Sequence, residues 1–184
     1  DILGPFHRDT SLIQSNLGIL YQFKGENSKS NEFFNLGLRG VFELVQREAQ
    51  NMLLSERHRF SQSVGDIYMT PFSFASDSDS GAEVALFSRL NHQGLLQQIE
   101  KRQSQLASIP GPQFELWTQV QKITKRIASK ESNVKGIQEL RIKKKQIEKE
   151  LYKKIPFLKP KIVEIVDVVA VIPKNSVLIE FQKY

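Results

Sequence analysis

The chain has 184 residues, a net charge of +6 and no cysteine, and 40% of its residues are hydrophobic. This composition is typical of a globular chain of one domain or somewhat more. Without cysteine the chain has no disulfide, no thiolate metal ligand and no cysteine nucleophile. Its longest uninterrupted apolar run, Val168 to Ile172, is far shorter than the roughly 20 residues of a membrane span.

The basic charge is concentrated in one segment. Residues 119–161 contain 14 Lys and Arg against 4 Asp and Glu, whereas the rest of the chain is slightly acidic. One group of lysines in this segment is a candidate for binding phosphates or an anionic membrane. Its members are Lys143, Lys144, Lys145, Lys149, Lys153 and Lys154. We favour the competing interpretation, a solvated helix face, because the group is rich in lysine rather than arginine.

The first segment predicts a helical hairpin. Asp9, Thr10 and Ser11 supply N-cap oxygens for a first helix, and Gly25 is a suitable turn before the second. The second helix has an apolar stripe at helical spacing. The stripe consists of Phe34, Leu38, Val41 and Val45. A third helix is expected between residues 49 and 64.

Residues 65–81 interrupt the helical pattern. They contain Pro71 and Gly81 and end in a run of Ser and Asp, so we expect a loop or linker and a domain boundary. Phe72 and Phe74 are expected to pack onto neighbouring helices rather than bind a ligand.

Three further helices are expected over residues 82–108, 113–129 and 133–155. The second includes Trp117, which we place in the core. The last has apolar residues at alternating spacings of three and four, interrupted only by Lys144. This narrow seam is typical of a coiled-coil-like antiparallel helix pair.

The tail has a different composition. Residues 163–172 are rich in β-branched residues, and residues 177–181 follow a turn signal at 173–176 and predict a strand. A lone strand needs a partner for its N–H and C=O groups. We therefore expect the strand to pair with further chain or with another protein.

Several positions of residues 11–44 match those of a known helical repeat. They are Leu17–Gly18, Tyr21, Gly25, Ser30 and Phe34, with departures at Gln14, Gly37 and Phe42. In these positions the segment resembles a tetratricopeptide repeat, a helix–turn–helix unit that stacks in series. The resemblance implies earlier repeats and a groove for a peptide or protein partner. Asn16 and Leu20 on the first helix would line that groove.

A second set of short motifs follows in a characteristic order. They are LFSRLN at 86–91, GLL at 94–96, IEKRQ at 99–103, LY at 151–152, IP at 155–156, IP at 172–173 and VLIEFQKY at 177–184. In order and spacing they resemble the segment that joins tetratricopeptide repeats to a CHAT domain, a caspase-like cysteine peptidase module of cyanobacterial type. The resemblance implies that residues 177–184 open the CHAT sheet and that the catalytic His–Cys pair lies beyond Tyr184. It also favours a short helix before the turn, so helix and strand stay open for residues 163–172.

No catalytic, cofactor or metal site is expected. His7, His58 and His92 are too scattered for a metal motif, and Asp77 and Asp79 lack the rest of a calcium loop. Because the sequence begins with Asp1 rather than Met, we expect a processed product or a piece of a longer protein. No secretory signal is visible, and we expect a cytoplasmic location.

We therefore predict a mainly α protein with a short β element at its C-terminus. Its parts are a tetratricopeptide-like hairpin with a capping helix (1–64), a linker (65–81), a helical connector (82–161) and the start of a CHAT-like sheet (162–184). The expected function is a non-catalytic scaffold for protein–protein interaction, the regulatory N-terminal part of a CHAT-type peptidase. The alternative is a basic helical module that binds nucleic acid or an anionic membrane through residues 122–161, and its binding would weaken steeply with salt.

Overall fold

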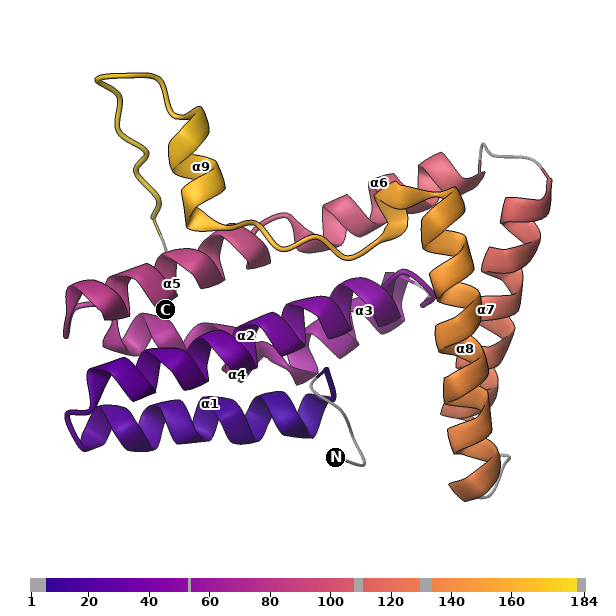
Figure 1. Ribbon diagram of the computed structural model, residues 1–184, viewed down its shortest axis with the longest axis horizontal. Coiled ribbons are helices and arrows are strands. Elements are labelled where there is room, and N and C mark those ends of the chain that lie inside the picture. Colours follow the sequence, from indigo (N-terminus) through magenta and orange to yellow (C-terminus); the bar gives the residue numbers. More distant parts are fainter. Residues whose placement is uncertain (1–5, 53, 108–110, 130–133, 182–184) are drawn as a thin grey trace.

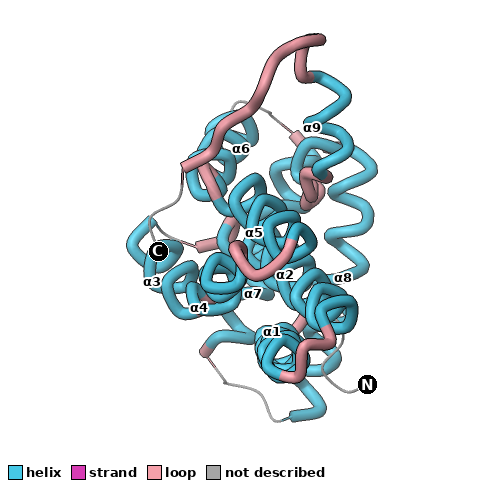
Figure 2. The backbone as a smooth tube through the Cα atoms, turned by 90° about the vertical axis from the view of Figure 1, so that its left-hand side faces the viewer, coloured by secondary structure: helices cyan, strands magenta, loops and turns pink. Residues whose placement is uncertain are grey.

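The computed structural model describes residues 6–52, 54–107, 111–129 and 134–181. Within these ranges the chain is mainly helical, as predicted, and contains no strand. Figure 1 shows α1, α2 and α5 lying side by side, with a helical pair standing across one end, and Figure 2 looks nearly along those three helices.

The predicted hairpin is formed by α1 (Arg8–Phe23) and α2 (Asn27–Ala49). Gly25 lies between them with φ of 72°, in the left-handed region that favours glycine. The N-cap of α1 is His7 rather than one of the three residues predicted, because its side chain accepts a hydrogen bond from the Asp9 N–H at 3.2 Å.

Small residues let α1 and α2 approach closely. A Cβ atom at Gly37 would lie 2.9 Å from the carbonyl oxygen of Ser11, a distance that the two backbones cannot accept without moving apart. Ser30 donates a hydrogen bond to the carbonyl of Gly18 at 2.9 Å across the same contact. The alanine that tetratricopeptide repeats have at the position of Gly37 therefore does not fit this pair.

The third helix is α3 (Leu54–Ser63), and α4 (Gly65–Met69) and the 3₁₀-helix η1 (Thr70–Phe74) follow it. The loop predicted for residues 65–81 was therefore wrong for residues 65–74. Ile67, Tyr68 and Phe72 are buried there, and their burial outweighs the local Gly and Pro signals. Phe74 packs beside Phe34 with the ring centroids 5.9 Å apart, which confirms its predicted role.

Two helices, α5 (Asp79–His92) and α6 (Leu95–Ala107), replace the single helix predicted for residues 82–108. Ser78 caps α5 by accepting a hydrogen bond from the Gly81 N–H at 3.1 Å. Gly94, with φ of 70°, separates the two helices.

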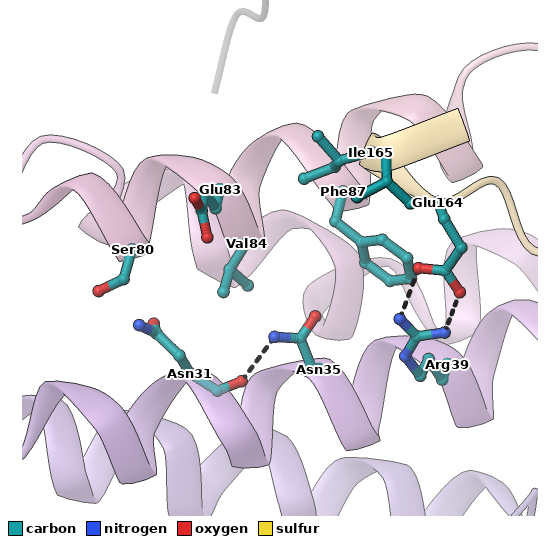
Figure 3. A pocket seen from close by; sticks show the side chains of 10 residues that line it. Asn31, Asn35, Arg39, Ser80, Glu83, Val84, Phe87, Glu164 and Ile165 are labelled. Atoms are coloured by element: carbon teal, nitrogen blue, oxygen red, sulfur yellow. Dashed lines mark hydrogen bonds and ion pairs between the residues drawn. The ribbon is translucent and has the colours of Figure 1, made fainter. Parts of the chain in front are cut away.

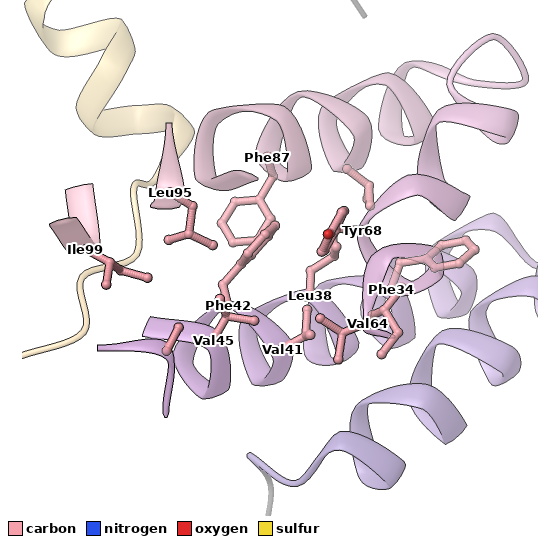
Figure 4. Packing of buried hydrophobic residues seen from close by; sticks show 13 residues of the cluster. Phe34, Leu38, Val41, Phe42, Val45, Val64, Tyr68, Phe87, Leu95 and Ile99 are labelled. Carbon is pink, nitrogen blue, oxygen red and sulfur yellow. The ribbon is translucent and has the colours of Figure 1, made fainter. Parts of the chain in front are cut away.

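The main core lies between α2, α4, α5 and the start of α6 (Figure 4). Its buried side chains include Phe34, Leu38, Val41, Phe42, Val45, Val64, Ile67, Tyr68, Val84, Phe87, Leu95 and Ile99. These residues come from both sides of the predicted linker. Residues 65–81 therefore do not separate two cores.

The pair across the end consists of α7 (Pro112–Ala128) and α8 (Val134–Lys154), which run antiparallel as predicted (Figure 1). A second apolar cluster joins them to the end of α6 and to the 3₁₀-helix η2 (Pro156–Leu158). Its buried members are Leu106, Val120, Leu151, Ile155 and Leu158. Trp117 is partly buried and packs against this cluster.

After η2 the chain runs back along α2 and α5 and ends in α9 (Ile165–Val171) and an extended tail. The sequence left helix and strand open for residues 163–172, and the structure has a helix over most of this segment. The strand predicted for residues 177–181 was wrong, because this exposed stretch has no partner strand among the described residues.

Candidate functional site: a groove between two helices

An extended segment, residues 159–164, lies along a groove between α2 and α5, and we term it the strap. Gln46 of α2 donates to the carbonyl of Lys161 at 2.9 Å and accepts from the N–H of Lys161 at 2.9 Å. Asn91 of α5 donates to the carbonyl of Val163 at 2.9 Å and accepts from its N–H at 2.8 Å. Two amide side chains thus bind alternate residues of the strap as a neighbouring strand would.

Both amides are buried and held in place by further contacts. Gln46 is 2% exposed and Asn91 is 6% exposed. Arg102 donates to Oε1 of Gln46 at 3.0 Å, and Asn91 also donates to the carbonyl of Phe87 at 2.9 Å. Because a buried polar group without a partner is costly, these side chains favour an extended backbone in the groove.

The end of the strap is fixed by an ion pair. Nη1 and Nη2 of Arg39 donate to the two carboxylate oxygens of Glu164 at 2.5 Å and 2.7 Å. These hydrogen bonds lower the pKa of Glu164 and raise the pKa of Arg39. The guanidinium also lies 4.7 Å from the ring centroid of Phe87. Arg39 is therefore positioned to bind a carboxylate bidentately.

Beyond Glu164 the groove is open (Figure 3). The open part has a volume of about 190 Å³. Asn31, Asn35 and Arg39 lie along it at successive turns of α2, and α5 contributes Ser80 and Glu83 from the opposite side. An extended chain longer than the strap would therefore meet further amide side chains there.

The predicted anion-binding lysines do not form one surface. Lys143, Lys145, Lys149 and Lys153 are exposed on α8, but Lys144 is buried. The Lys144 Nζ lies 2.6 Å from Oε2 of Glu48 in α2 and 3.8 Å from Oε1 of Glu148. The inclusion of Lys144 was wrong, because this side chain neutralises buried carboxylates instead of facing solvent.

The two carboxylates beside Lys144 have opposite pKa shifts. Burial acts to raise the pKa of Glu48, but the charges and hydrogen bonds of Lys144 and Arg47 outweigh it and lower the pKa. Burial raises the pKa of Glu148, and its Oε1 is buried without a hydrogen bond. The charge of Glu148 is therefore the less well compensated of the two.

Replacing Glu148 by glutamine is expected to leave the protein at least as stable as the wild type at pH 7. In the folded wild type the Glu148 carboxylate binds a proton at a higher pH than it does in the unfolded chain. The stability from that proton is fully present below the ordinary pKa and is lost as the pH rises through the raised pKa. Urea unfolding between about pH 4 and pH 8 should show the difference between variant and wild type shrinking as the pH falls toward 4.5, the ordinary value.

The control for this measurement is Glu48→Gln. The lowered pKa of Glu48 contributes stability above its ordinary pKa and loses it as the pH falls through the folded value. This variant should therefore be destabilised at pH 7. Equal losses at pH 7 in both variants would contradict the assigned shift of Glu148.

The other candidate positions lie apart from the groove. Asn16 and Leu20 are exposed on α1, and His58 and His92 line a separate hollow of about 360 Å³. Burial lowers the pKa of His92, and the charge of Arg89 adds to this effect. Over the described ranges no group of His, Asp and Glu is suited to a metal ion, and no helix is long and apolar enough to cross a membrane.

Sequence reasoning missed Arg39, Gln46 and Asn91. A signal was present for the two amides, since each lies four residues after a buried aromatic residue, Phe42 or Phe87, and so continues an apolar stripe. A buried amide in such a stripe requires a hydrogen-bonding partner.

The sequence matches no protein-family model, and it has no match among curated proteins or solved structures. The tetratricopeptide and CHAT resemblances therefore stay predictions. The helical hairpin expected from the first of them is present in the fold.

Proposed function

We propose that this chain is a non-catalytic helical scaffold for protein–protein interaction and that it binds an extended segment of its partner in the groove between α2 and α5. The observation that carries the proposal is the binding of the strap by Gln46 and Asn91. Hydrogen bonds to the main chain supply affinity for an extended peptide, and side-chain contacts supply specificity.

The resemblance of residues 82–184 supports a more specific proposal. In it, the scaffold is the regulatory N-terminal part of a CHAT-type cysteine peptidase, and α7 and α8 relay partner binding to the peptidase by a rigid-body shift. The strap connects η2, which follows α8, to α9, so a change in the groove would act on the chain that leads from the helical pair to the tail.

The alternative is a nucleic-acid or membrane-binding module. Lys145, Lys149 and Lys153 are exposed and follow at intervals of four residues, so they lie on one face of α8. Such a row supports electrostatic binding of phosphates, which weakens steeply as salt rises.

The two functions differ in their response to salt and to substitution. We expect the immobilised chain to retain a protein partner from its source cells at both low and high salt. Arg39→Ala should lose that partner, and a Lys145→Ala/Lys149→Ala/Lys153→Ala variant should keep it. Binding that goes only to nucleic acid or anionic vesicles, and that the triple lysine variant abolishes, would refute the scaffold function.

A further inference from the structure

The contacts of the strap divide its residues into two kinds. Lys161 and Val163 are bound through their main chain, so these contacts set no requirement on the side chain. Ile162 packs against the main core, and Glu164 is bound by Arg39. Ile165, the first residue of α9 directly after the strap, also packs against the core. The groove therefore selects an apolar residue, then any residue, then Glu, then a second apolar residue.

The same order of residues occurs three more times in the chain, at 41–44 inside α2, at 137–140 inside α8 and at 178–181 in the exposed tail. Leu178, Ile179, Glu180 and Phe181 repeat the pattern of residues 162–165, and the side chains of Ile179 and Phe181 are largely exposed. Oε2 of Glu180 lies 3.3 Å from Nε of Arg89, two residues before Asn91 in α5. This exposed segment is a natural probe for the selectivity of the groove.

A fully buried residue flanks the strap at one end only. Leu158, just before it, is fully buried in the second apolar cluster. After it, α9 has no buried residue, and the tail from residue 173 to residue 181 is exposed. Releasing the strap therefore breaks four hydrogen bonds to amides and one half-exposed ion pair, and uncovers mainly Ile162 and Ile165.

We propose that the groove between α2 and α5 binds extended peptides of the pattern apolar–any–Glu–apolar, and that the strap is an intramolecular ligand which such a peptide displaces. This inference rests on the proposed scaffold function and names the class of peptide and its regulation. A tethered ligand competes at an effective concentration in the millimolar range, so partner binding is held back until the strap is released. The open part of the groove at Asn31 and Asn35 gives a longer peptide contacts that the strap does not use.

The test uses the full chain and a fluorescent peptide with the sequence of residues 159–166, measured by anisotropy. Val163→Pro weakens the strap without changing the groove, because proline lacks the N–H that Asn91 accepts. We expect the peptide to bind this variant about tenfold more tightly than the wild type. Adding Arg39→Ala to the variant should reverse that gain.

Three altered peptides test the selectivity. A peptide with lysine in place of Glu164 should bind the Val163→Pro chain at least about tenfold more weakly, since Arg39 then faces a like charge. A peptide with alanine in place of Val163 should bind as the parent does, because this residue is bound through its main chain. A peptide of residues 176–181 should compete with the parent peptide.

Hydrogen exchange gives the second measurement. Binding of the peptide to the wild type should speed exchange of the Lys161 and Val163 amides, whose N–H groups are released with the strap. Unchanged protection of these amides during binding, or equal affinity of the parent and lysine peptides, would overturn the inference. If the full chain still retains a protein partner in that case, the scaffold function stands and only the assignment of this groove fails.

Discussion

Replacing Lys144 by alanine is expected to lower the free energy of unfolding by about 3–5 kcal/mol, the usual effect of removing one partner of a buried ion pair. The Lys144 side chain is only 8% exposed and lies 2.6 Å from Glu48. Its loss leaves the Glu48 and Glu148 carboxylates buried beside Arg47 alone. Denaturant unfolding at pH 7, followed by circular dichroism, measures the change.

The neighbouring lysines supply matched controls. Lys143 and Lys145 are exposed, so Lys143→Ala and Lys145→Ala should change the free energy of unfolding by no more than about 0.5 kcal/mol. Similar changes in the free energy of unfolding for all three variants would mean that Lys144 is solvated like its neighbours. That result would contradict the buried ion pair.

The ion pair of Lys144 and Glu48 also attaches α7 and α8 to the main body of the protein. Lys144 interrupts the apolar seam of α8, and its ammonium group reaches Glu48 near the C-terminal end of α2. Arg47 donates to the other oxygen of Glu48 at 3.0 Å. The residue that broke the predicted coiled-coil pattern thus connects α8 to the main body, together with Tyr152 of α8, whose hydroxyl accepts a hydrogen bond from Gln50 at 3.4 Å.

Local pattern was sufficient for the hairpin and for the pair of α7 and α8. Helical spacing, together with Gly25 at the turn, places α1 and α2 nearly where they are found. Local pattern failed at residues 65–74, where Pro71 indicates a loop. The burial of Tyr68 and Phe72 decides the structure there. Tyr68 stacks on Phe42 of α2, and no short window of sequence contains that information.

The groove could not be predicted from the sequence for the same reason. Gln46 and Lys161 are 115 residues apart, and Asn91 and Val163 are 72 residues apart. The Pro and β-branched residues of the strap predict only that its backbone is extended. Its partners are side-chain amides of two helices, which no strand-pairing pattern identifies.

The length of α2 is what brings these sites together, and Phe42 is central to it. The tetratricopeptide pattern predicted for residues 11–44 has proline at this position, and proline would end the helix. Here Phe42 lets α2 continue to Ala49, so that one helix carries both Gln46 and Glu48. The same side chain is fully buried between Tyr68 and Phe87, with ring centroids 6.2 Å and 6.3 Å away.

Phe42→Ala is therefore expected to cost about 3–5 kcal/mol, the range for removing a large aromatic side chain from a core. Leu36 on the same helix is 43% exposed, and Leu36→Ala should cost less than about 1 kcal/mol. The cavity left by the missing Phe42 ring would lie between α2 and α5, beneath the strap. Phe42→Ala should therefore also speed hydrogen exchange of the strap amides at Lys161 and Val163 under conditions where the protein is still folded. A loss of about 3–5 kcal/mol without faster exchange at these two amides would show that the groove does not depend on the core beneath it.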